Sequence, residues 1–476
     1  MKKIKKTKII ATLGPASSSS DTIEKLIKEG VDVLRINFSH SSHDEAEALI
    51  KEIRKTNTKL NTNTSILADL QGPKLRIGEI IPGTNLDIGS KLKIKTGKEF
   101  IGDNNMLFVN YESLPKDISE GEKILIDDGK IILKVTDTNK KDQIITEVIQ
   151  GGEISSNKGF NLPNTNISQP ALTDKDIEDA VFSAKQNVDW IALSFVRHES
   201  DIKSLIDLLE ENTNHRIPVI AKIEKPEGVK NIDEIMKYAS GIMVARGDLG
   251  VEINAAEVPL IQKKLVYKAK KARIPVIIAT QMMESMMESL NPNRAEVNDV
   301  ANSVMDGADA VMLSGETSVG KHPVEVIQTV SNIIGKVENS NLISLKHKHP
   351  TDYDSDRFIT KSICYYAAKI ANDTNAKAIS TLTNSGYTAY QISSWRPKTH
   401  VLVFTSNKRI LTQLNLLWGV KAFYYDGTES TDKTVEEINK IAFDNNYLQK
   451  NEKVINLTSM PIHKKGMVNT VRVSKI

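Results

Sequence analysis

The stretch VDWIALSFVRHESDIKSLIDLLEENTNHRIPVIAKIE, residues 188–224, decides the fold of this 476-residue chain. It begins and ends with a short apolar run rich in β-branched residues, at 188–195 and 217–224. Between them, residues 198–212 repeat apolar side chains at the spacing of an amphipathic helix. A strand, a helix and a second strand predict a βαβ unit whose parallel sheet is buried on both faces.

The same pattern recurs along much of the chain. Helical patterns such as 21–30 and 172–187 separate further short apolar runs. Six of these runs are expected to be strands: 8–14, 31–38, 65–72, 241–247, 274–280 and 308–315. Eight strands with intervening helices match a closed (β/α)8 barrel, which is the predicted fold. A doubly wound open sheet is the alternative.

Two changes of pattern predict the domain organisation. Residues 73–166 carry short strand patterns divided by Gly, Asp and Asn turns, which predicts an antiparallel β domain inserted in a barrel loop, where lids are found. After residue 345 a polar linker precedes a second strand–helix alternation. We therefore expect a barrel domain (1–72 and 167–345), an inserted lid domain (73–166) and a C-terminal α/β domain (346–476).

Composition narrows the classes of partner and compartment. The net charge is +3, from 63 basic and 60 acidic residues, so no broad field favours nucleic acid or a membrane surface. No apolar segment approaches the ~20 residues of a membrane span, and the N-terminal apolar run is too short for a signal peptide. The single cysteine, Cys364, fits a reducing compartment. The expected location is the cytoplasm.

Charged and polar side chains follow many of the predicted strands. The set comprises Arg35, Asn37, Asp69, Lys222, Glu224, Arg246, Asp248, Thr280 and Ser314. A (β/α)8 barrel builds its site at the carboxyl ends of its strands, so these groups are expected to converge on one face.

Two carboxylates in this set are candidates for a metal site. Lys222 and Glu224 lie two residues apart, so on a regular strand they project to the same side. On an exposed strand such a pair would be a solvated ion pair, but here it follows a fully apolar run. Glu224 and Asp248 together supply hard oxygen ligands, which suit Mg²⁺.

The other members of the set fit a phosphorylated substrate. Arg35 can bind a phosphate with two hydrogen bonds, although a structural ion pair is the alternative. Gly247 exposes backbone N–H groups beside Asp248, and Thr280 offers a hydroxyl that could instead cap a helix. This equipment fits phosphoryl transfer, while the sequence has neither a GxxxxGK[ST] loop nor an HRD/DFG pair.

Several segments, spread in order over nearly the whole chain, resemble the pyruvate kinase family. They include RINFSH, GPKLR, KIEKPEGV, MVARGDLGVEI and DAVMLSGET. The resemblance implies a (β/α)8 barrel, an inserted β-barrel lid, a C-terminal domain and a homotetramer. It also implies transfer of a phosphoryl group from phosphoenolpyruvate to ADP, giving pyruvate and ATP in the last step of glycolysis.

The resemblance assigns roles around the substrate. Arg35 would hold the phosphate of phosphoenolpyruvate, and Lys222 would stabilise the phosphoryl group in flight and the developing enolate. The turn at Gly247 and Asp248, together with Thr280, would receive the substrate carboxylate. Thr280 would also lie on the route by which the enolate is protonated.

The resemblance also assigns the metal and the nucleotide. Glu224 and Asp248 would bind Mg²⁺ or Mn²⁺, and His40, Arg76 and Lys158 would contact the nucleotide.

One departure concerns potassium. Many pyruvate kinases hold this ion with residues that match Asn37, Ser39 and Asp69, next to a TKGPE segment. Here the segment reads LQGPK (70–74), which resembles the potassium-independent branch of the family. A tethered ammonium on Lys74 can supply the charge of the monovalent ion, so potassium is expected to be dispensable. The alternative is a solvated lysine at the lid hinge.

The loop TLTNSGYT in the C-terminal domain is rich in hydroxyl groups and glycine, and such a loop can bind phosphate. In the family the matching loop takes a phosphate of a sugar-phosphate effector; a nucleotide effector is a further candidate. Read alone, the loop is equally an ordinary strand-to-helix turn. The candidate residues are Thr383, Asn384, Ser385, Gly386 and Thr388. Residues 463–465 could contact a second phosphate.

Two alternatives to a pyruvate kinase follow from the same residues. A barrel lyase or aldolase that works through a metal enolate would explain the carboxylate pair but not the inserted β domain. A catalytically inactive metabolite sensor would tolerate loss of Lys222 or Glu224, yet both are present. Ser41 and Asn293 stand where the family has glycine and threonine, and only small local adjustments are expected.

Overall fold

Eight parallel strands form a closed barrel in the order β1-β16-β15-β14-β13-β12-β3-β2. The structure is a computed structural model that describes residues 5–340, 349–351, 353–427, 430–460 and 467–476. The barrel strands are β1 (Lys8–Thr12), β2 (Val33–Asn37), β3 (Ser65–Asp69), β12 (Trp190–Leu193), β13 (Val219–Ile223), β14 (Gly241–Ala245), β15 (Val276–Ala279) and β16 (Ala310–Leu313). All eight lie within the predicted runs, so the barrel is confirmed and the open sheet is excluded.

Helices surround the barrel because each has one apolar face. In α1, for example, Ser19 caps the first turn, Ile23 and Leu26 are fully buried, and Gly30 ends the helix at φ 114°. The helices outside the barrel are α1 (Ser20–Glu29), α2 (His43–Leu60), α4 (Asp174–Lys185), α5 (Glu199–Asn212), α6 (Pro226–Lys230), α7 (Ile232–Ile235), α8 (Arg246–Glu252), α9 (Val258–Ala272), α10 (Arg294–Asp306), α11 (Gly315–Ser318) and α12 (Pro323–Glu338). Asn293, in place of the family's threonine, caps α10 by accepting from the backbone N–H of Glu296.

The barrel interior is a packed core, and side chains of the C-terminal region cover its amino end. Large side chains such as Trp190 and Met243 fill it, and every residue of this cluster is at most 2% exposed. Leu416 joins this cluster from the C-terminal region, with Tyr390 packed against it. Trp190 donates its indole N–H to the carbonyl of Gln413 at 3.1 Å. The opposite end of the barrel, where the strands terminate, is left for the site.

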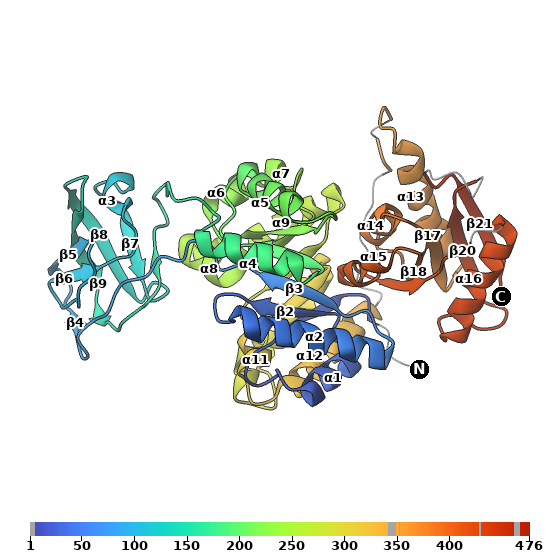
Figure 1. The fold of residues 1–476 in the computed structure, drawn as a ribbon, viewed down its shortest axis with the longest axis horizontal. Helices are drawn as coiled ribbons and strands as arrows, with labels where there is room; N and C mark the ends of the chain where they lie inside the picture. Colours follow the sequence, from blue (N-terminus) through green and yellow to red (C-terminus); the bar gives the residue numbers. More distant parts are fainter. Residues whose placement is uncertain (1–4, 341–348, 352, 428–429, 461–466) are drawn as a thin grey trace.

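Residues between β3 and α4 form two small sheets that stand beside the barrel (Figure 1). One sheet pairs β4 with β10, and the other has the order β11-β7-β8-β9-β5-β6. The elements are β4 (Asn85–Leu86), β5 (Lys91–Lys95), β6 (Met106–Phe108), α3 (Leu114–Asp117), β7 (Lys123–Ile126), β8 (Ile131–Thr138), β9 (Gln143–Gln150), β10 (Gly152–Glu153) and β11 (Phe160–Asn161). All pairs are antiparallel, as predicted, except the parallel pair β5–β6.

The C-terminal region forms a five-stranded sheet, β19-β18-β17-β20-β21, on the opposite side of the barrel from the inserted sheets (Figure 1). Its elements are α13 (Phe358–Asp373), β17 (Ala378–Leu382), α14 (Tyr387–Ser394), β18 (His400–Thr405), α15 (Lys408–Gln413), β19 (Val420–Tyr424), α16 (Thr431–Asp444), β20 (Lys453–Thr458) and β21 (Thr470–Lys475). Sequence reasoning missed the edge strand β21. The predicted boundary at 345/346 lies outside the described residues. Among the described helices, none is long and apolar enough to cross a membrane.

Candidate active site

The predicted site residues gather where the barrel strands end. Arg35 lies on β2, Asp69 is the last residue of β3, and Lys222 lies on β13. Asp248 is in the first turn of α8, directly after β14, and Thr280 follows β15. Parallel strands place their carboxyl ends at one rim of the barrel, and this topology brings the five residues to the same rim.

Arg35, Asp69 and Lys222 form a chain of buried charges. The Arg35 Nε atom donates to Asp69 Oδ2 at 2.6 Å, and its Nη1 atom donates to the hydroxyl of Thr12 at 2.9 Å. Lys222 Nζ lies 3.1 Å from Asp69 Oδ1 and donates to the hydroxyl of Ser194 at 2.7 Å. Asp69 is fully buried, so its carboxylate holds two cations at fixed positions.

The protonation states of Asp69 and Lys222 follow from the charged groups that surround them. Burial opposes ionisation of Asp69, but Arg35 and Lys222 outweigh it and hold the pKa of the carboxyl below its ordinary value. Burial likewise opposes the charge on Lys222, but Asp69 and Glu224 raise the pKa of the ammonium above its ordinary value. Lys222 therefore stays protonated in the folded protein throughout the physiological range.

Glu224 is the second carboxylate at this rim, and it is 1% exposed. Its Oε1 atom lies 3.3 Å from Lys222 Nζ, and its Oε2 atom accepts the backbone N–H of Phe195 at 2.7 Å. Burial raises the pKa of Glu224 well above its ordinary value, and the nearby charge of Asp248 adds to the shift. A buried carboxylate near a half-buried one of the same charge suits a divalent cation, so this donor set fits Mg²⁺ or Mn²⁺.

The turn after β14 contacts the turn after β15. The backbone N–H of Gly247 donates to Thr280 Oγ1 at 2.8 Å. Thr280 and Gln281 both have positive φ, 70° and 53°, which is strained backbone of the kind found at functional sites. Arg246 stabilises this turn, because its Nη2 atom donates to the carbonyl of Thr280 at 2.7 Å and its Nη1 atom donates to Asp299 at 2.7 Å.

Basic side chains line the mouth of the site. Lys74 is exposed and lines a cleft of about 900 Å³ that also contains Gly247 and Asp248. Burial, followed by the charges of Lys74, Arg76 and Arg35, lowers the pKa of His40. His40 is therefore neutral at pH 7, beside three cations that a polyphosphate could contact.

The inserted region contributes basic side chains from the two places where it adjoins the barrel. Arg76, between β3 and the first inserted strand, donates from Nη1 to the carbonyl of Asn157 at 2.8 Å. Lys158, between β10 and β11, lies 3.1 Å from Asp127 Oδ1. The next residue, Asp128, lines the same cleft as Lys74. Asp127 and Asp128 both have positive φ, 52° and 57°.

The residues predicted for the potassium region are only partly brought together. Asn37 Oδ1 accepts the backbone N–H of Ser39 at 3.1 Å, and Asn37 pairs in register with Asp69. The carboxylate of Asp69 is already shared between Arg35 and Lys222. The positive charge of Lys74 contributes to lowering the pKa of His40.

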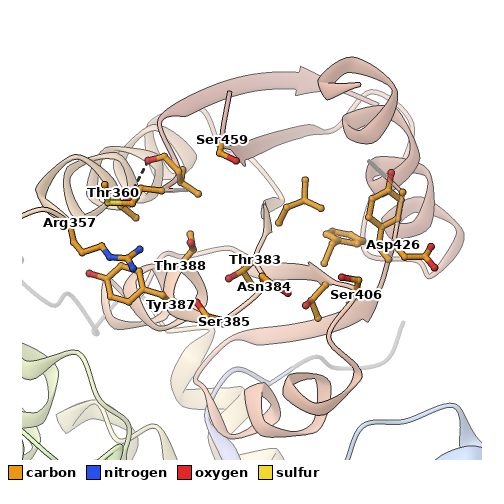
Figure 2. Close-up of a pocket in the computed structure, with 17 residues that line it drawn as sticks. Arg357, Thr360, Thr383, Asn384, Ser385, Tyr387, Thr388, Ser406, Asp426 and Ser459 are labelled. Carbon is orange, nitrogen blue, oxygen red and sulfur yellow. Dashed lines mark hydrogen bonds between the residues drawn. The ribbon is translucent and has the colours of Figure 1, made fainter. Parts of the chain in front are cut away.

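The C-terminal region holds a second pocket, of about 330 Å³, which Figure 2 shows. Its lining includes the predicted residues Thr383, Asn384, Ser385 and Thr388. Gly386 caps α14 with φ 82°, a conformation that favours glycine, and donates its N–H to Thr383 Oγ1 at 3.0 Å. Residues 463–465 lie outside the described residues.

Sequence reasoning missed the neutral and acidic partners of the site. Thr12 orients Arg35, Ser194 orients Lys222, and Asp127 contacts Lys158. Each is separated by 23 or more residues from the side chain it orients, so no local spacing links them. The only available signal is their position: Thr12 and Ser194 also lie at strand ends.

The fold and the site define a (β/α)8-barrel protein whose rim carries charge-paired cations next to two carboxylates that suit a divalent metal ion. The family follows from comparison with known proteins. The family model "Pyruvate kinase, barrel domain" matches residues 4–327, and "Pyruvate kinase, alpha/beta domain" matches residues 361–474. The chain belongs to the pyruvate kinase family, so it is a phosphotransferase, as the sequence predicted.

Individual relatives agree over nearly the full length. The chain is 41% identical to the pyruvate kinase of Corynebacterium efficiens over 470 residues, covering 98% of this chain and 97% of the relative. It is 38% identical to a pyruvate kinase of Mycobacterium tuberculosis over 98% of both chains. A crystal structure of a Cryptosporidium parvum pyruvate kinase superposes with a TM-score of 0.92 at 32% identity, covering 99% of this chain and 96% of that one.

Proposed function

We propose that this chain transfers the phosphoryl group of phosphoenolpyruvate to ADP and forms pyruvate and ATP, the last step of glycolysis. The buried chain of Arg35, Asp69 and Lys222 carries the proposal. Phosphoryl transfer depends on positioning and charge neutralisation. The Asp69 carboxylate fixes two cations, Arg35 and Lys222, which do not have to reorganise during the reaction.

The transfer is written as one displacement. An oxygen of the ADP β-phosphate attacks phosphorus, and the bond between phosphorus and the enol oxygen breaks. The enolate of pyruvate leaves with the bonding electrons and takes up a proton at its methylene carbon. Arg35 binds the phosphate of the substrate, Lys222 stabilises both the phosphoryl group and the enolate oxygen, and Thr280 lies on the route of the proton. Ketonisation of the product drives the reaction forward.

The substrate carboxylate is assigned to the turn at Gly247 and Asp248 together with Thr280. Support comes from the hydrogen bond of 2.8 Å between the Gly247 N–H and Thr280 Oγ1, which fixes the two turns together. The strained backbone at Thr280 presents its hydroxyl at the rim.

The metal is assigned to Glu224 and Asp248. The described residues contain no group of three or more histidine, cysteine or acidic side chains that could hold a metal alone. Two protein carboxylates are nevertheless the usual protein share of a Mg²⁺ site that substrate oxygens and water complete. When bound, Mg²⁺ or Mn²⁺ would neutralise negative charge on the reacting phosphate.

The nucleotide is assigned to His40, Arg76 and Lys158, and residues 73–166 to a lid that closes over it. Support comes from the position of Arg76, between β3 and the first inserted strand, and of Lys158, directly before the last inserted strand β11. The barrel itself is assigned to 1–72 and 167–345, and the C-terminal domain to 346–476.

Potassium is assigned no essential role. The sequence departs from the potassium-binding pattern at Leu70, which is buried, and at Lys74, which lines the same cleft as Asp248. We infer that Lys74 supplies the positive charge that a monovalent ion brings in other members of the family. The region of Asn37, Ser39 and Asp69 is then held together by protein groups.

The C-terminal pocket is proposed to bind a phosphorylated effector, a sugar phosphate or a nucleotide. Its support is the row of hydroxyl and amide groups around the pocket and the guanidinium of Arg357, which lies 5.0 Å from the ring centre of Tyr387 (Figure 2). The proposal is tested by measuring whether fructose 1,6-bisphosphate or AMP changes the KM for phosphoenolpyruvate.

We further propose a homotetramer in the cytoplasm. Two large apolar side chains on α9, Leu260 and Tyr267, are 69% and 70% exposed in the single chain, as expected for a face that another copy covers. Light scattering of the purified protein tests the assembly, and cell fractionation tests the location.

The central experiment measures pyruvate formation from phosphoenolpyruvate and ADP with Mg²⁺, in a buffer free of monovalent metal ions to which potassium is then added. Full activity without potassium is the expected result. Strong activation by potassium would keep the activity and refute the role of Lys74. Cleavage of another substrate, or ligand binding without turnover, would instead favour the lyase or sensor alternatives.

A further inference from the structure

A buried carboxylate that the proposed mechanism does not use joins the inserted sheets to the barrel. Glu252, the last residue of α8, is 4% exposed. Its Oε1 atom accepts from Asn161 Nδ2 at 2.9 Å and from Lys225 Nζ at 2.6 Å. Its Oε2 atom is buried without a hydrogen-bond partner among the described residues. Among these contacts, both hydrogen bonds to the Glu252 carboxylate are accepted by one oxygen.

The contact with Asn161 reaches the lid. Asn161 lies three residues after Lys158, at the end of β11, the last strand of the inserted sheets before the chain returns to the barrel. Helix α8 lies on the side of the barrel that faces these sheets (Figure 1). The hydrogen bond between Asn161 and Glu252 therefore holds β11, the last inserted strand, against the barrel rim.

The contact with Lys225 reaches the metal-binding carboxylates. Lys225 directly follows Glu224 and is 6% exposed, and Glu252 lies one helical turn after Asp248 in α8. The ion pair between Lys225 and Glu252 thus connects the segment that carries one carboxylate to the helix that carries the other. Because the pair is buried, neither partner can be replaced by water at low cost.

We propose that Glu252 is a positioning residue that couples the placement of the lid to the spacing of the metal-binding carboxylates. The inference rests on the proposed function for the identity of the metal and nucleotide sites. Through Asn161, Glu252 restrains the strand next to Lys158. Through Lys225, it restrains the neighbouring Glu224. Glu252 itself touches neither substrate nor metal ion in this account.

The two contacts can be separated by substitution. Asn161→Ala removes the link to the lid and leaves the ion pair intact. Glu252→Gln keeps an oxygen that accepts from Asn161 but leaves the buried ammonium of Lys225 without its counter-charge. A general loss of stability would affect both variants alike, whereas a positioning role predicts different kinetic effects.

Asn161→Ala is expected to raise the KM for ADP about tenfold, because it removes a hydrogen bond to a charged group. The KM for phosphoenolpyruvate and the affinity for Mn²⁺ should change less than twofold. Asn166→Ala is the matched control, since Asn166 is exposed and lies five residues further on, in the segment between β11 and α4. An unchanged KM for ADP in an active Asn161→Ala enzyme would overturn the proposal.

Glu252→Gln is expected to weaken Mn²⁺ binding about tenfold, measured by calorimetry on the full chain without turnover, and to lower kcat. Unchanged Mn²⁺ affinity in a folded variant would contradict the coupling. If Glu252→Gln fails to fold, Asn161→Ala still decides the question. An inactive wild-type enzyme would refute the proposed function, and weaker ADP binding by Asn161→Ala in calorimetry would still support the link to the lid.

Discussion

Lysines with little exposure to water lie at both ends of the barrel, but their pKa values shift in opposite directions at the two ends. At the carboxyl end, Asp69 and Glu224 outweigh burial and raise the pKa of Lys222. At the amino end, Lys8 on β1 is buried and Lys270 on α9 is half-buried. There burial lowers the pKa of Lys8 to about 8 and that of Lys270 to about 7.

The difference lies in what surrounds each ammonium. Lys222 has two carboxylates within 3.3 Å. Lys8 donates to the carbonyl of Val420 at 2.9 Å, and its one carboxylate, Asp32, is 3.5 Å away and shared with Lys5. Lys222 is therefore held as a fixed charge by two carboxylates, whereas Lys8 joins the barrel to the C-terminal region.

The largest effect is expected from Lys222→Met, which removes the fixed cation but keeps the length of the side chain. The kcat for pyruvate formation should fall about 10³-fold or more, because a preorganised charge at the reacting group is lost. Near-normal kcat in this variant would show that the carboxyl-end network is not catalytic.

Asp69→Asn should be nearly as damaging, since Arg35 and Lys222 lose the charge that they share. We expect kcat to fall about 10²-fold and the free energy of unfolding to drop by about 3 kcal/mol, because two buried cations remain next to each other. Urea denaturation measures the second quantity. Asp207→Asn, on the exposed face of α5, is the control; equal stability of the two variants would contradict the account.

Lys74→Glu tests an exposed lysine at the mouth of the carboxyl end. In buffer free of monovalent metal ions, kcat/KM for phosphoenolpyruvate should fall about tenfold, and potassium should restore part of it. Lys98→Glu, an exposed charge reversal on the inserted sheets, should do neither. If the two variants behave alike, Lys74 is a solvated hinge residue.

Lys270→Met tests the amino end, and its effect is on stability. The folded pKa of about 7 lies below the ordinary value of 10.5, so between these values the unfolded chain binds the extra proton. Unfolding free energy of the wild type should therefore rise with pH over this range. Lys270→Met should be about 1–2 kcal/mol more stable at pH 7, and the gain should shrink towards pH 10.

The exposed neighbour Lys271 supplies the control for this measurement. Lys271→Met should leave the slope of stability against pH unchanged. A Lys270→Met protein that is less stable than the wild type at pH 7 would show that the hydrogen bond from Lys270 to the carbonyl of Asp306, 2.7 Å long, outweighs the cost of burial.

The sequence predicted the barrel and most of the rim because both have local signals. Each strand is a continuous apolar run, and residues such as Asp69 and Lys222 stand at or next to its end. The partners of these residues have no such signal: Ser194, Thr12 and Glu252 meet their partners only through tertiary packing. The opposite pKa shifts of the lysines at the two ends depend on the same packing, so the spacing of residues in the sequence could not predict them.

The most direct test of the account measures pyruvate and ATP together, formed from phosphoenolpyruvate and ADP by wild type and Lys222→Met under identical Mg²⁺ concentrations. The account predicts equal amounts of the two products from the wild type and a loss of about 10³-fold in the variant, with Mn²⁺ binding retained. Pyruvate without ATP, or full activity without Lys222, would contradict it.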